Sequence, residues 1–134
     1  MAPDQPCGRT VVIVDDDPGM RDSVAALLEM SGFPIRHYGT AESFLADPGA
    51  CDRVGCLLID QHFSGMSGTD LLRRLSARGR MPPAILFSAR LTETIIREAR
   101  SAGALAVLDK PVGPMALIRH LWAALQVVRT VEEF

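Results

Sequence analysis

The chain has 134 residues, of which 48% are hydrophobic and 22% charged, with a formal net charge of −2. These values predict one domain with a sizeable core and exclude the strongly basic surface of a nucleic-acid-binding domain. No stretch has the pattern of a signal peptide or the roughly 20 apolar residues of a membrane span. The three cysteines, Cys7, Cys51 and Cys56, lack metal-type spacing. We therefore expect free thiols in a cytoplasmic protein.

Apolar runs and helical patterns alternate along the chain. Short apolar runs typical of strands buried in a parallel sheet lie at 9–14, 34–38, 54–60, 84–87 and 105–109. Patterns typical of helices lie at 18–30, 41–46, 69–78, 92–102 and 113–128. This order predicts an α/β fold, a doubly wound five-stranded parallel sheet with helices on both faces. We expect one domain at 9–129, a loose tail at 1–8 and a frayed end at 130–134.

Three of the predicted strands end in charged residues. The first strand runs into Asp15 and Asp16, and the next residue, Asp17, precedes a proline and is typical of a helix N-cap. The third strand ends at Asp60, and the fifth is followed by Lys110. Because open α/β sheets bind ligands at the carboxyl ends of their strands, we expect these side chains to form one site.

Such a cluster needs a cation. At about 5 Å and an effective dielectric constant near 20, each pair of carboxylates repels by about 3 kcal/mol. Lys110 supplies one positive charge, and oxygen ligands with room for a phosphate favour Mg²⁺ over coordination by the ring of His62. A carboxylate beside Mg²⁺ and a lysine can attack phosphorus and form an aspartyl phosphate. Ser88, at the end of the neighbouring strand, could donate a hydrogen bond to the phosphoryl oxygens.

Several short motifs occur in a fixed order. They are VDDDP at 14–18, LID at 58–60 with GMSG at 65–68, FSA at 87–89, AGA at 102–104 and KP at 110–111. In this order and spacing the chain resembles a response regulator receiver domain of two-component signalling, over about residues 9–128. Within that family it is most similar to receivers of the nitrogen-fixation regulator type. The resemblance implies a flavodoxin-like (βα)5 fold with strand order 2-1-3-4-5.

The resemblance also implies roles for individual residues. Asp60 would accept a phosphoryl group from the phosphohistidine of a sensor histidine kinase. The domain would then be a signalling receiver that catalyses only its own phosphorylation and dephosphorylation. Asp16, Asp60 and the backbone carbonyl of His62 would bind Mg²⁺, and Asp15 would act on it through water. Ser88 would be the switch hydroxyl, and Lys110 would contact the phosphate.

Two positions depart from the family pattern. The family usually has an aromatic residue where this chain has Val107, and commonly a proline where it has Ser64. Both leave the phosphorylation site whole, but the first motivates an alternative, a receiver-like interaction module that does not switch by phosphorylation. A phosphatase with an aspartate nucleophile is disfavoured, because such enzymes usually have a second acid two residues after the nucleophile, where this chain has His62.

The resemblance also suggests partners besides the kinase. We expect the surface of the fourth helix, fifth strand and fifth helix to carry self-association as a homodimer or contact with an output partner, with Ile95 and Ile96 contributing. One predicted helix follows Lys110, so an output domain would lie in further chain. Neither nucleic acid nor membrane is expected to bind this chain directly.

Overall fold

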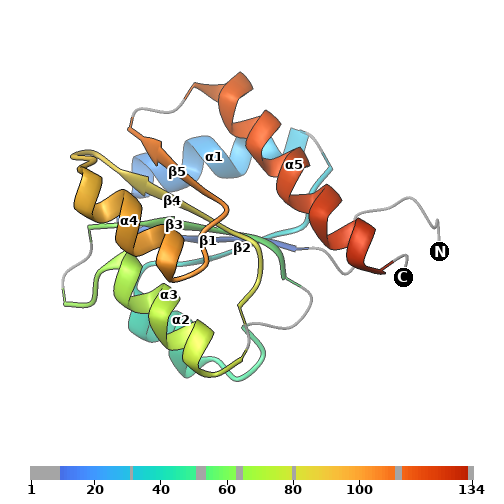
Figure 1. Ribbon diagram of the computed structural model, residues 1–134. Coiled ribbons are helices and arrows are strands. Elements are labelled where there is room, and N and C mark those ends of the chain that lie inside the picture. The colour runs from blue at the N-terminus through green and yellow to red at the C-terminus, as the bar shows by residue number, and fades with distance from the viewer. Residues whose placement is uncertain are drawn as a thin grey trace.

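The computed structural model describes residues 10–30, 32–50, 54–62, 65–79, 81–110 and 113–132. Strands and helices alternate throughout these ranges (Figure 1). The strands are β1 (Thr10–Val14), β2 (Ile35–Tyr38), β3 (Val54–Asp60), β4 (Ala84–Ser88) and β5 (Ala106–Asp109). The helices are α1 (Pro18–Met30), α2 (Ala41–Ala46), α3 (Gly68–Ala77), α4 (Glu93–Ser101) and α5 (Pro114–Glu132).

The strands form one sheet in the order β2-β1-β3-β4-β5, and every pairing is parallel. The predicted doubly wound fold and its strand order are therefore confirmed. The register aligns Val14 with Ile59, Asp60 with Phe87, and Ser88 with Asp109. The carboxyl ends of β1, β3, β4 and β5 consequently lie side by side at one edge of the sheet.

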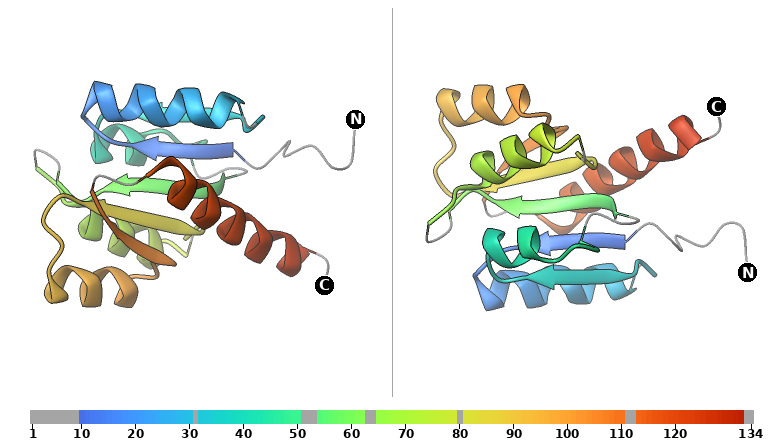
Figure 2. Two further views of the ribbon diagram at one scale, coloured as in Figure 1. Left: turned by 90° about the horizontal axis from the view of Figure 1, so that it is seen from above. Right: turned by 90° about the horizontal axis from the view of Figure 1, so that it is seen from below.

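Helices cover both faces of this sheet. α1 and α5 lie on one face, and α2, α3 and α4 lie on the other (Figure 2). On β3, Leu57 and Ile59 pack in the cluster with α2, α3 and α4, whereas Cys56 and Leu58 pack in the cluster with α1 and α5. Because a strand alternates its side chains between the faces, a strand covered on both sides reads as a continuous apolar run.

Side-chain caps set several helix boundaries. The Thr92 side chain accepts a hydrogen bond from the backbone of α4 and so starts that helix. α3 starts slightly earlier than predicted, at Gly68, because Ser67 and Asp70 form a reciprocal capping box. α5 continues to Glu132, beyond its predicted end at residue 128. Among the described residues, no helix combines the length and apolar character needed to cross a membrane.

Candidate functional site

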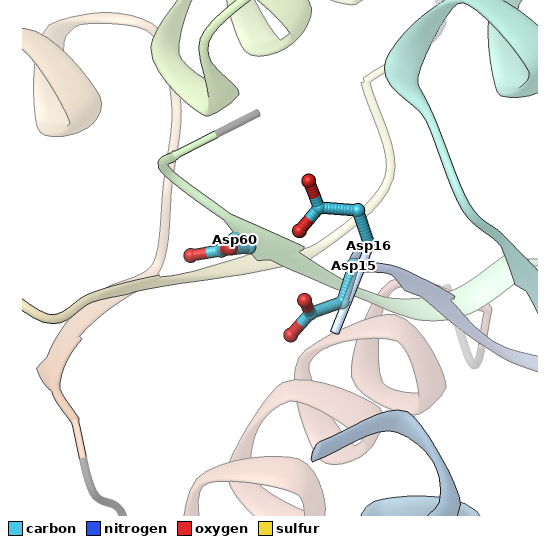
Figure 3. Close-up of side chains that lie close together, drawn as sticks. All are labelled: Asp15, Asp16 and Asp60. Atoms are coloured by element: carbon cyan, nitrogen blue, oxygen red, sulfur yellow. The ribbon is translucent and has the colours of Figure 1, made fainter. Parts of the chain in front are cut away.

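Three carboxylates meet at the carboxyl edge of the sheet. Asp15 and Asp16 directly follow β1, and Asp60 is the last residue of β3 (Figure 3). One oxygen from each side chain lies within 4.8 Å of the others. The register brings Asp15 and Asp60 together, because Val14 pairs with Ile59 and the residue after each of these two is an aspartate.

The three carboxylates differ in burial. The exposed fractions of Asp15 and Asp60 are only 2% and 5%, whereas Asp16 is exposed. Burial raises the pKa of Asp15, and the neighbouring charge of Asp60 adds to the effect. Two contacts oppose it: the amide N–H of Asp17 donates to Asp15 Oδ1 at 2.9 Å, and Lys110 supplies positive charge. The site is therefore one where added positive charge would be stabilising.

Lys110, directly after β5, provides positive charge to this site. Its Nζ lies 3.2 Å from Asp60 Oδ1 and 3.5 Å from Asp15 Oδ2. The Lys110 amide N–H donates to the carbonyl of Ser88 at 2.9 Å, which fixes the end of β5 beside β4. Asp60 Oδ1 is buried and, within the described part of the chain, accepts no well-formed hydrogen bond despite the lysine nearby. Lys110 supplies a single positive charge beside three carboxyl groups, so the pocket favours a further cation.

Ser88 lies at the end of β4 and is completely buried. Its Oγ accepts a hydrogen bond from the amide N–H of Arg90 at 3.2 Å and lies 3.1 Å from Nε2 of His62. The ring of His62 thus contacts Ser88, whereas the potential metal ligands grouped in the described ranges are the three aspartates. No sequence pattern indicates this contact between His62 and Ser88, because the two residues belong to different segments.

A second set of bonds holds the chain just after Asp60. The side-chain carbonyl of Gln61 accepts the amide N–H of Thr69 at 2.9 Å, and the Gln61 backbone carbonyl accepts that of Gly68 at 3.0 Å. A Cβ atom on Gly68 would lie 2.6 Å from both the Asp60 carbonyl oxygen and Leu86 Cδ1. The start of α3 is therefore pressed against the end of β3, a role of Gln61 and Gly68 that the sequence alone did not reveal.

The remaining candidate positions lie near the site or outside the described residues. Val107 is half-buried in β5 and packs in the apolar cluster with α2, α3 and α4. Cys56 is a buried free thiol. Ser64, Cys7 and Cys51 fall outside the described residues.

The fold and site together define a flavodoxin-like domain whose acidic pocket and lysine lie where the strands end, the arrangement of a phosphate-signalling module. The family profile described as the response regulator receiver domain matches residues 11–121. The chain belongs to this family, and the predicted class of function, a receiver of two-component response regulators, is confirmed.

Relatives of known function support the predicted subtype. The transcriptional regulatory protein FixJ of Azorhizobium caulinodans is 36% identical over 115 residues, which are 86% of this chain and 54% of FixJ. The C4-dicarboxylate transport transcriptional regulatory protein DctR of Rhodobacter capsulatus is 36% identical over 104 residues, 76% of this chain and 52% of DctR. The chain thus spans about half the length of the regulators that it matches.

Solved structures show the same fold. The crystal structure of FixJ-N matches with a TM-score of 0.80 at 32% identity, and the match covers 88% of this chain and 94% of the FixJ-N chain. A CheY-like receiver domain protein from Methanospirillum hungatei has a TM-score of 0.83 at 28% identity, with coverages of 91% and 97%. The resemblance to nitrogen-fixation regulators therefore extends from the sequence to the backbone.

Proposed function

We propose that Asp60 accepts a phosphoryl group from the phosphohistidine of a sensor histidine kinase and that the domain then changes conformation. The observation that carries this proposal is the position of the Asp60 carboxylate. It lies at the end of a central strand, with Lys110 Nζ 3.2 Å away and the carboxylates of Asp15 and Asp16 beside it.

The donor set suits a hard divalent cation. Each of the three side chains offers one oxygen, and these oxygens lie within 4.8 Å of one another. One buried oxygen of Asp60 has no well-formed hydrogen bond within the described chain. In the proposed site Asp16, Asp60 and the backbone carbonyl of His62 would hold Mg²⁺, and Asp15 would act through water. When bound, Mg²⁺ would stabilise the charge that develops on the phosphoryl oxygens.

The residues of the chain supply the rest of the transfer. A carboxylate oxygen of Asp60 forms the new P–O bond while the P–N bond of the phosphohistidine breaks. The imidazole takes the electron pair of that bond and, protonated on its other ring nitrogen, leaves as the kinase's neutral histidine. Lys110 neutralises part of the charge on the transferred group. Hydrolysis of the acyl phosphate by water restores Asp60. The domain on this proposal catalyses only its own phosphorylation and dephosphorylation.

The proposed partners follow from the family and the surface. The kinase is one partner. The second is either an output domain in further chain, as the greater length of the matched transcriptional regulators suggests, or another copy of this domain. The proposed contact surface is the face of α4, β5 and α5. Ile95 and Ile96 of α4 are half-buried and Met115 of α5 is 74% exposed, while Leu105, directly before β5, is 50% exposed.

Labelling with a small phosphodonor tests the phosphoacceptor. Wild-type protein incubated with acetyl phosphate and Mg²⁺ is expected to gain the mass of one phosphoryl group, and Asp60→Asn is expected to gain none. Asp22→Asn, at an exposed position of α1, is the matched control and should label like wild type. Labelling that persists in Asp60→Asn would refute the assignment.

The alternative, an interaction module without a phosphorylation switch, is motivated by Val107. An aliphatic side chain at this position has neither the size nor the polar edge of an aromatic switch residue. This alternative predicts that beryllofluoride with Mg²⁺ leaves the amide NMR spectrum beyond the pocket and the oligomeric state unchanged. Spectral changes that reach α4 and β5 would favour the switching domain.

A further inference from the structure

The hydroxyl of Ser88 is already occupied in the unphosphorylated domain. Ser88 is completely buried, so solvent cannot satisfy it, and an unpaired buried hydroxyl would be costly. Its Oγ accepts from the amide N–H of Arg90 and lies 3.1 Å from Nε2 of His62. Within the described residues these are the recorded hydrogen-bond contacts of the hydroxyl, and none joins it to Asp60.

We propose that His62 is a positioning residue that holds the Ser88 hydroxyl away from Asp60 in the resting domain, an inference that rests on the proposed function. On phosphorylation the hydroxyl exchanges the imidazole for a phosphoryl oxygen. Both states then satisfy the buried hydroxyl, and the bond to His62 stabilises the resting one. His62 thereby opposes activation until phosphate is present.

The direction of the exchange follows from charge. A phosphoryl oxygen on Asp60 is anionic, and hydrogen bonds to ionised groups are about twice as strong as those between neutral groups. His62 is exposed, so its ring exchanges Ser88 for water at little cost. Val107 packs among apolar side chains and has no polar atom with which to follow the hydroxyl. The movement of Ser88 is therefore transmitted first to His62, in the segment after β3, rather than to β5.

The hydrogen bond can be tested without phosphate. Side-chain ¹⁵N NMR of the unphosphorylated protein is expected to show a shift of the His62 Nε2 resonance between wild type and Ser88→Ala, while the His37 resonances stay in place. His37 is exposed on β2 and serves as the internal control. An Nε2 resonance indifferent to Ser88→Ala would overturn the proposal.

Binding of beryllofluoride with Mg²⁺ tests the role in switching. Removing the competing imidazole should favour the activated state, so His62→Ala is expected to bind beryllofluoride about three- to tenfold more tightly than wild type, the range of one lost hydrogen bond. The variant keeps the backbone carbonyl of residue 62. In a Ser88→Ala background the same change should have no effect, because there is no hydroxyl to hold. His37→Ala is the control and should match wild type.

The outcomes separate this inference from the proposed function. If wild-type protein binds beryllofluoride and His62→Ala binds it no more tightly, the positioning role is overturned and the phosphoacceptor assignment stands. The same holds if His62→Ala raises the affinity equally with Ser88 present and with Ser88 replaced by alanine. Failure of wild-type protein to bind beryllofluoride would overturn the phosphoacceptor assignment and the role of His62 with it.

Discussion

Nζ of Lys110 lies 3.2 Å from Oδ1 of Asp60, so a side chain from the end of β5 crosses the end of β4 to reach the carboxylate of β3. The same ammonium group lies 3.5 Å from Asp15 Oδ2, at the end of β1. The lysine is therefore the counter-ion of the two buried carboxylates. On the proposed function it would also hold a phosphoryl oxygen on Asp60.

Replacing Lys110 with alanine should damage both roles. Beryllofluoride affinity in the presence of Mg²⁺ is expected to fall about 10- to 100-fold, the range of one lost hydrogen bond to a charged group. The two buried carboxylates also lose their cation, so the free energy of unfolding without Mg²⁺ should fall. Fluorescence or NMR titration and urea unfolding measure the two effects. Arg74→Ala, an exposed cation on α3, is the control, and Lys110→Ala binding as tightly as wild type would contradict the contact.

The buried Asp15 makes stability depend on pH. Its pKa is raised by burial, so the folded domain holds a proton on Asp15 at pH values where the unfolded chain has released it. The free energy of unfolding contributed by Asp15 is thus greatest below the ordinary pKa near 3.8 and decreases as pH rises through the raised value. Without divalent cations, Asp15→Asn should then be more stable than wild type at neutral pH, on the order of 1 kcal/mol for one partly compensated carboxylate pair.

Mg²⁺ should reverse this advantage. A cation that binds the folded domain stabilises it by mass action, and wild type has one more carboxylate with which to hold it. Thermal unfolding of both proteins with and without Mg²⁺, from pH 4 to 8, measures the effect. Asp22→Asn should track wild type throughout. A wild-type domain more stable than Asp15→Asn in the absence of metal at neutral pH would be inconsistent with the burial cost.

Gly68 should not tolerate a side chain. A Cβ there would lie 2.6 Å from the Asp60 carbonyl oxygen and from Leu86 Cδ1, and neither the backbone nor the packed leucine can move freely. Gly68→Ala is expected to cost about 1–3 kcal/mol of unfolding free energy, as overpacking in a core does. Gly113→Ala, where no atom lies within 4 Å of the added Cβ, is the control. Equal urea midpoints for the two variants would contradict the close approach of α3 to β3.

Cys56 should report global unfolding. The thiol is fully buried in β3, and burial raises its pKa to about 12, so almost no reactive thiolate exists at neutral pH. In a variant with Cys7 and Cys51 replaced by serine, Ellman's reagent should react slowly with the native domain and rapidly in urea. Rapid labelling under native conditions would show that this core opens locally.

Much of the candidate site could be predicted because each strand ends at a visible boundary in the sequence. One apolar run stops at Asp60, another at Asp15 and a third just before Lys110. If these strands are parallel, their carboxyl ends lie at the same edge of the sheet, and so do the three charged groups. The contact between His62 and Ser88 could not be predicted in this way. It depends on the side-chain directions after two neighbouring strands end, and periodicity carries no information there.

The sequence by itself determined the order of strands and helices along the chain, the two-sided burial of the sheet and the acidic edge. Apolar runs indicate which segments are buried, and capping residues mark where helices begin. Only the tertiary structure decided which aspartates are buried, how Gln61 and Gly68 join α3 to β3, and what holds the hydroxyl of Ser88. These features depend on register and on the path of the chain between elements, and distances of a few ångströms between distant segments are set by packing as a whole.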